Sequence, residues 1–77
     1  MNLQEVNVLR RLDNLVTAGG TGVVETQFGP VTVHPTRYHG YAAEILDDNG
    51  QKWVEFAHVP SAAFLRLGES VLDRASN

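Results

Sequence analysis

Four side chains that could do chemistry lie in segments with the alternating pattern of β-strands: Glu25, His34, Glu44 and Glu55. Carboxylates and imidazoles bind Zn²⁺ or Mn²⁺, and two such groups close together can act as a general acid and a general base. The four residues have no short metal-ligand spacing, however, and a cross-strand pair between Glu25 and His34 would account for two of them. The pattern therefore predicts no metal, no cofactor and no catalytic residue, which favours a protein that is not an enzyme.

Nucleic-acid binding is suggested by the loop 35–41, which holds Arg37, Tyr38 and His39. Basic and aromatic side chains can contact phosphates and stack on bases. The whole chain has only six Lys and Arg residues, however, and its net charge is −3, so the electrostatic attraction that most nucleic-acid binding needs is weak. We therefore expect a protein partner rather than nucleic acid.

The composition is that of a small folded domain with an acidic balance. The 77 residues suffice for one domain, 1–77, and 43% of them are hydrophobic while 19% are charged. Cysteine is absent, which excludes disulfides and thiolate chemistry. No apolar run approaches the roughly 18 residues of a membrane-spanning helix, and the first residues lack the pattern of a secretory signal. We expect a cytoplasmic protein with no membrane contact.

Two amphipathic segments predict helices, one near each end of the chain. From Leu3 to about Ala18, apolar residues recur with a period near 3.6, and Gly19 follows as a stop signal. The second segment runs from Pro60 to about Ala75, with Ser61 as the expected N-cap.

Two hairpins are predicted between the helices. Asn49 and Gly50 are a favourable pair for a two-residue turn, which would join segments 41–46 and 53–58. Gly29 and Pro30 would join segments 23–28 and 31–34. The order α-β-β-β-β-α predicts an α+β fold, in which two helices pack on the apolar face of a four-stranded antiparallel sheet that is open or curled into a small barrel.

A two-residue turn at Asn49 and Gly50 also predicts which side chains share a face. The core side of the second hairpin would then carry Tyr41, Ala43, Ile45, Val54, Phe56 and His58. On the other face, Trp53 would lie beside Leu46, and Glu44 would lie opposite Glu55. Such a face leaves a large apolar area in water and puts like charges together, so it is expected to meet a partner.

This second face is the predicted interaction surface, and its partner-binding residues are Trp53, Glu44, Glu55, Leu46, Gln27 and Thr32. An apolar anchor with a polar rim is typical of interface hot spots. Its occupant could be a second copy, which would make the protein a homodimer, or a basic partner attracted by the glutamates.

In size, acidity and lack of a catalytic signature, the chain resembles small phage or mobile-element proteins that inhibit nucleic-acid machines by occupying basic surfaces. The resemblance is one of class and implies an inhibitory interaction module. One alternative is a homo-oligomeric domain with a ligand, metal or catalytic site on the sheet face or at the subunit interface. The other is a nucleic-acid-binding domain that uses the loop 35–41.

Overall fold

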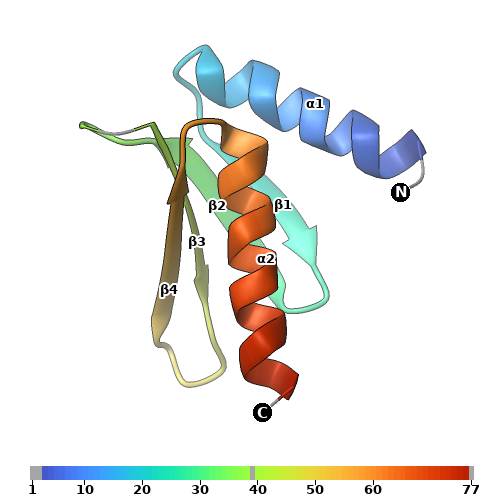
Figure 1. The fold of residues 1–77 in the computed structure, drawn as a ribbon, viewed down its shortest axis with the longest axis vertical. Coiled ribbons are helices and arrows are strands. Elements are labelled where there is room, and N and C mark those ends of the chain that lie inside the picture. Colours follow the sequence, from blue (N-terminus) through green and yellow to red (C-terminus); the bar gives the residue numbers. More distant parts are fainter. Residues whose placement is uncertain (1–2, 39, 77) are drawn as a thin grey trace.

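The computed structural model describes residues 3–38 and 40–76. Its elements are α1 (Leu3–Thr17), β1 (Gly22–Thr26), β2 (Gly29–Pro35), β3 (Tyr41–Leu46), β4 (Lys52–Ala57) and α2 (Pro60–Ser76). The strands form one antiparallel sheet in the order β1-β2-β3-β4, so each strand pairs with its neighbours in the chain (Figure 1). The predicted α+β fold is confirmed, and the sheet is open rather than closed into a barrel.

Helix α2 covers one face of the sheet and contributes Ala63 and Leu67 to the core. The buried core cluster consists of Leu12, Val16, Val31, Val33, Ala43, Ile45, Ala63 and Leu67. These residues come from both helices and the two central strands, so the core depends on their joint packing. Full burial of one such aliphatic side chain stabilises a fold by about 1.5–3 kcal/mol.

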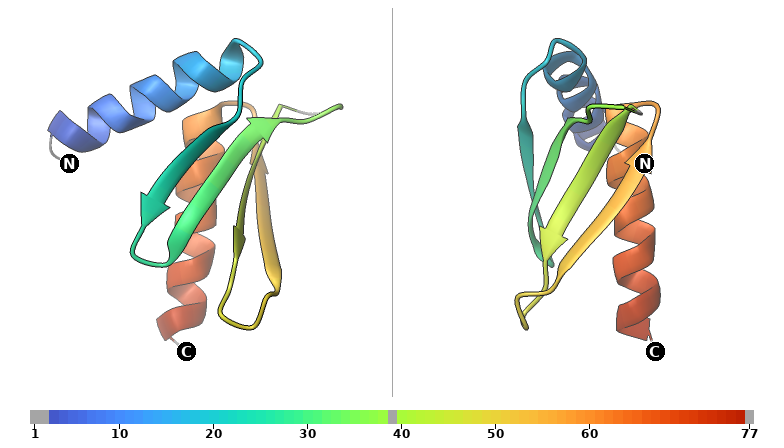
Figure 2. Two further views of the ribbon diagram at one scale, coloured as in Figure 1. Left: turned by 180° about the vertical axis from the view of Figure 1, so that it is seen from behind. Right: turned by 90° about the vertical axis from the view of Figure 1, so that its left-hand side faces the viewer.

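Helix α1 lies across one end of the sheet instead of along it (Figures 1 and 2). It contacts α2, β1 and β2. Leu12 and Val16 are buried, whereas Val8 and Leu15, which the sequence pattern places on the same stripe, are exposed. The predicted packing of both helices on the sheet therefore applies to α2 and only in part to α1. None of the described helices is long and apolar enough to cross a membrane.

Asp13 of α1 holds the start of α2. Its carboxylate accepts hydrogen bonds from the Ser61 backbone N–H at 2.8 Å and from the Ser61 hydroxyl at 2.9 Å. A carboxylate at this position satisfies an N–H that has no partner within the helix and interacts favourably with the helix dipole. Because α2 already begins at Pro60, Ser61 is not the N-cap that its sequence predicted, and the capping oxygens come from α1.

The register predicted for the second hairpin is wrong by one residue. Leu46 lies opposite Lys52, and Ile45 lies opposite Trp53. The loop contains three residues instead of two, because Asp47 N–H donates to the Gln51 carbonyl and Gly50 N–H donates to the Asp47 carbonyl, both at 2.9 Å. A two-residue turn of the expected type needs a positive φ at Asn49, and among the described residues only glycines have one.

The one-residue shift turns every side chain of β4 to the opposite face of the sheet. Trp53 and Ala57 therefore pack against the core cluster. Of the residues expected in the core, Phe56 and His58 are exposed and Val54 is half-buried. Tyr41, Ala43 and Ile45 of β3 lie on the core side as predicted.

The first hairpin turns earlier than predicted. Thr26 lies opposite Gly29, so Gln27 and Phe28 form the turn, and Gly29 and Pro30 begin β2. The Thr26 hydroxyl favours this turn, since it donates to the Gly29 carbonyl at 2.7 Å and accepts from the Phe28 N–H at 3.1 Å. The pairing moves by an even number of residues, so Val31 and Val33 still face the core.

Candidate interaction surface

The sheet has one face that the described helices leave uncovered (Figure 2). Side chains alternate along each strand, so the neighbours of the core residues point to this side. We call it the open sheet face, and it consists of Val23, Glu25, Pro30, Thr32, His34, Ala42, Glu44, Leu46, Lys52, Val54 and Phe56.

Strand pairing arranges these side chains in three rows. The row nearest the turns of the two hairpins runs Glu25, Pro30, Leu46, Lys52. The middle row runs Val23, Thr32, Glu44, Val54, and the third runs His34, Ala42, Phe56. Opposite charges therefore lie at the two edges of the first row, with Glu25 on β1 and Lys52 on β4.

Large apolar side chains are exposed on the open sheet face. Val23 and Leu46 are each 60% exposed, and Phe56 is 54% exposed. An antiparallel sheet with one solvated face normally alternates apolar side chains inside with polar ones outside. The exposed apolar residues here depart from that pattern.

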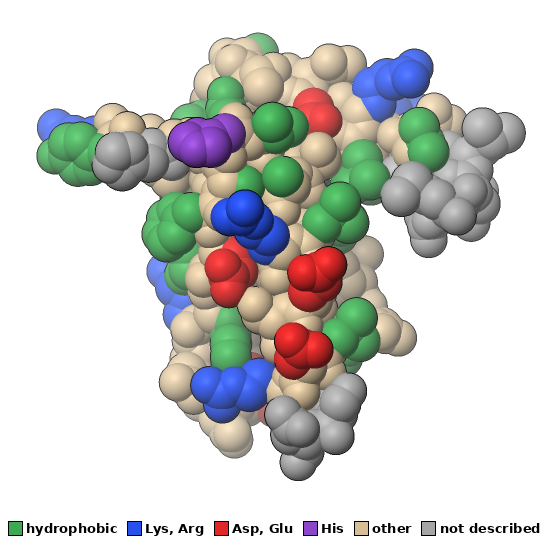
Figure 3. Space-filling view, viewed as in Figure 1, with side chains coloured by type: hydrophobic (Ala, Val, Ile, Leu, Met, Phe, Trp, Pro, Cys, Tyr) green, Lys and Arg blue, Asp and Glu red, His purple; other side chains and the backbone are tan. Residues whose placement is uncertain are grey.

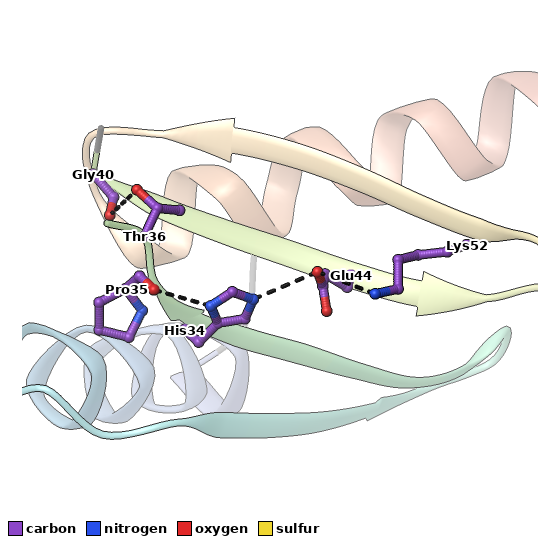
Figure 4. A network of polar contacts seen from close by, with 6 residues as sticks. All are labelled: His34, Pro35, Thr36, Gly40, Glu44 and Lys52. Carbon is purple, nitrogen blue, oxygen red and sulfur yellow. Dashed lines mark hydrogen bonds and ion pairs between the residues drawn. The ribbon is translucent and has the colours of Figure 1, made fainter. Parts of the chain in front are cut away.

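Polar contacts cross the centre of the open sheet face (Figure 4). A Glu44 carboxylate oxygen lies 3.5 Å from His34 Nε2 and 3.6 Å from Lys52 Nζ. On the other side of its ring, His34 Nδ1 lies 3.0 Å from the Pro35 carbonyl. The His34 ring thus lies between two acceptors, the Pro35 carbonyl and the Glu44 carboxylate.

A shallow hollow of about 250 Å³ lies on the same face. Pro30, Thr32, Glu44, Leu46 and Lys52 line it. Its volume is below the range of about 300–1,000 Å³ that is typical of small-molecule pockets, so a side chain of a protein partner suits it better.

Three of the six predicted partner-binding residues, Thr32, Glu44 and Leu46, lie together on the open sheet face. Gln27 lies in the exposed turn of the first hairpin. Trp53 and Glu55 lie on the helix side, because the register of β4 differs from the predicted one. Glu55 accepts a hydrogen bond from the Ser70 hydroxyl of α2 at 2.8 Å.

The residues that take the place of Trp53 and Glu55 on this face are Lys52, Val54 and Phe56. One feature of the sequence favours the register that places them there. Asp47 and Gly50 are the first and fourth residues of a possible β-turn, and aspartate and glycine at these positions favour a type I turn. Hairpin loops of three residues are built on this type of turn.

Trp53 lies between the second hairpin and α2. Its Nε1–H donates to Asp47 Oδ2 at 3.0 Å, and the Arg74 guanidinium carbon lies 4.3 Å from the ring centroid. The hydrogen bond from Trp53, together with those from the Gln51 and Asn49 backbone N–H groups, lowers the pKa of Asp47 below its usual 3.8. These contacts give Trp53 a structural role.

The loop predicted to contact nucleic acid is closed by Thr36, whose N–H and hydroxyl both donate to the Gly40 carbonyl, at 2.9 and 3.0 Å. Arg37 and Tyr38 are exposed in it, and Tyr38 is 80% exposed. His39 lies outside the described residues.

The four residues that suggested a metal or acid-base site do not converge. His34 and Glu44 meet, Glu25 lies at the β1 edge, and Glu55 is on the other face. Within residues 3–38 and 40–76, no group of three His, Asp or Glu side chains could hold a metal ion.

The helix-covered side has a hollow of its own, about 540 Å³, bordered by Phe28, Trp53 and Arg74. The hydrophobic side chains on this side form separate patches between acidic and basic ones (Figure 3).

Comparisons of the chain with protein-family models, curated proteins and solved structures find no match.

Proposed function

We propose that the protein is a small, non-enzymatic protein-interaction module and that its open sheet face binds a partner protein. The observation that supports this function is the exposure of Val23, Leu46 and Phe56 on one face of an otherwise well-packed sheet. Exposed apolar side chains that alternate with polar ones on one face are found at protein–protein interfaces.

The charges of the open sheet face favour protein over nucleic acid as the partner. Glu25 and Glu44 are its carboxylates, and Lys52 is its one permanent cation. A surface of this kind lacks the basic stripe that supplies most of the affinity for a phosphate backbone.

A basic partner is no longer the favoured one. That prediction rested on repulsion between Glu44 and Glu55, which lie on opposite faces, and Glu44 already contacts His34 and Lys52. An inhibitory role, an origin in a phage or mobile element and a cytoplasmic location stay predictions from the sequence.

Site-specific photo-crosslinking tests the proposed function. Phe56 is replaced by a benzophenone amino acid in the cells that make the protein, and Leu65 on α2 serves as the control position because its exposure is similar, 47% against 54%. After nuclease treatment, we expect protein crosslinks from position 56 well above those from position 65. A second substitution, Leu46→Lys, should reduce them because it places a charge within the apolar surface.

Equal crosslinking from both positions would assign binding to another part of the surface. Crosslinks from position 56 that disappear entirely with nuclease would show nucleic acid as the ligand, and either result would overturn the proposal.

A further inference from the structure

We propose that the partner that covers the open sheet face is a second copy of this chain, packed face to face around a twofold axis that runs parallel to the strands. This inference rests on the proposed function and names its partner. It is argued from the order of side chains in the rows of the open sheet face.

A twofold axis parallel to the strands places each edge strand opposite the other edge strand of the second copy. β1 then faces β4, β2 faces β3, and each row faces the same row of the second copy. Two sheets that pack in this aligned way are about 10 Å apart, with their strand directions within about 30° of each other.

The charges at the edges of the first row are complementary in this arrangement. Glu25 faces Lys52 of the second copy, and Lys52 faces its Glu25, so the symmetry forms two opposite-charge contacts. Glu25 is exposed, and the Lys52 side chain is 57% exposed, so both can reach across the interface.

The middle row is complementary as well. Val23 faces Val54 of the second copy, and the Thr32 hydroxyl faces the Glu44 carboxylate, to which it can donate a hydrogen bond. An axis across the strands at the level of the middle row would instead place Glu44 opposite Glu44 of the second copy, and like charges that face each other at an interface are unfavourable. The charge pattern thus favours the axis parallel to the strands.

The hollow on the open sheet face also fits this orientation. Pro30 and Leu46 both line it, and Leu46 of the second copy faces Pro30. The exposed Leu46 side chain would enter the hollow of the second copy, and the symmetry repeats this contact.

A charge-swap experiment tests the orientation directly. Sedimentation equilibrium gives the dimer dissociation constants of the wild type, Glu25→Lys, Lys52→Glu and the double variant. In each single variant both contacts become repulsive, so we expect the dimer dissociation constant to rise about tenfold or more. In the double variant the charges are exchanged between the two edges, and wild-type affinity should return.

Mixing the two single variants is the decisive step. A heterodimer of Glu25→Lys with Lys52→Glu contains two opposite-charge contacts, so the mixture should associate with near wild-type affinity although each variant alone does not. One variant is labelled with ¹⁵N, so that native mass spectrometry identifies the heterodimer. Recovery in the mixture also excludes loss of the internal contact between Lys52 and Glu44 as the cause of weak binding.

Glu69→Lys is the matched control, since Glu69 is exposed on α2 and makes the same change of charge away from the face. It should leave the dissociation constant unchanged. A wild type that stays monomeric at millimolar concentration, or a mixture that associates no better than its components, would overturn the inference.

The two proposals fail in different ways. A monomeric wild type whose position 56 crosslinks to other proteins would remove the second copy as partner and keep the interaction module. A monomeric wild type without protein crosslinks at position 56 would remove both.

Discussion

Asp47 organises the end of the second hairpin as a single residue. Its Oδ1 accepts the backbone N–H groups of Asn49 and Gln51 at 2.9 and 2.8 Å, and its Oδ2 accepts the Trp53 Nε1–H at 3.0 Å. The ionised carboxylate thus joins the turn to the only tryptophan of the chain, which provides a spectroscopic probe of the turn.

Protonation of Asp47 should loosen this turn in acid. Its folded pKa is lowered below 3.8, so its stabilising effect is complete above about pH 4 and is lost as the pH falls through the folded value. We expect the NMR shift of the Trp53 Nε1–H to move with a midpoint below pH 3.8. Asp47→Asn should remove this transition; a transition that persists in the variant would assign it to another carboxylate.

Trp53 should contribute to stability because it packs against the core cluster. Removal of a core Trp costs about 3–5 kcal/mol, so Trp53→Ala, at a half-buried position, should lower the free energy of unfolding by about 2–3 kcal/mol. Leu46→Ala, on the open sheet face, should change it by less than about 0.5 kcal/mol at a concentration where the chain is monomeric. Urea denaturation measures both; the reverse order of effects would support the two-residue turn.

At the scale of elements, the hairpin loop decides which face each side chain of β4 occupies. Gly50 has a φ of +80°, whereas Asn49 has a negative φ. A residue with a Cβ costs about 1–2 kcal/mol in the left-handed region.

Two alanine substitutions distinguish the three-residue loop of the second hairpin from the two-residue one. Gly50→Ala should destabilise the protein by about 1–2 kcal/mol, and Asn49→Ala should have a much smaller effect because its φ suits any residue. Thermal unfolding measures both, and a loss of about 1 kcal/mol shifts Tm by about 4–8 °C in a domain of this size. A large loss from Asn49→Ala would indicate a positive φ there.

The hydrogen bonds between Asp13 and Ser61 connect the two helices. Asp13→Ala should cost about 1.5–3 kcal/mol, because it removes two hydrogen bonds to a charged group and leaves a helix N–H without its partner. Ser61→Ala should cost less, since the backbone N–H still donates. A double-mutant cycle on these two positions should show coupling, and additive effects would contradict the contact.

At the scale of the whole molecule, a small chain depends on few buried side chains. About 0.05–0.15 kcal/mol per residue predicts a total stability of about 4–12 kcal/mol for 77 residues. Val33 and Leu67 join the sheet to α2, and each is at most 1% exposed.

Leu67→Ala should therefore remove about 2–5 kcal/mol, a large part of that total. Leu65→Ala, on the exposed side of the same helix, is the matched control and should cost less than about 1 kcal/mol. Chemical denaturation followed by circular dichroism compares the two. Similar losses would mean that α2 is rotated about its own axis, so that Leu65 also faces the core.

Local sequence signals determined the elements and their order. The apolar period near 3.6 in the helices and the glycine-rich connections predict α-β-β-β-β-α, since these signals act within a few residues of each other. In β2 and β3, the alternation also predicted the core side, where Val31, Val33, Ala43 and Ile45 are buried.

Only the tertiary structure decided which side of β4 faces the core and how α1 lies. Asp48-Asn49-Gly50 is compatible with a loop of two or three residues, and one residue of difference exchanges Trp53 and Glu55 for Val54 and Phe56 on the open sheet face. The choice depends on contacts distant in sequence, such as those of Trp53 with Arg74 and of Glu55 with Ser70. Asp13 likewise finds its partner 48 residues away, and no local pattern carries that information.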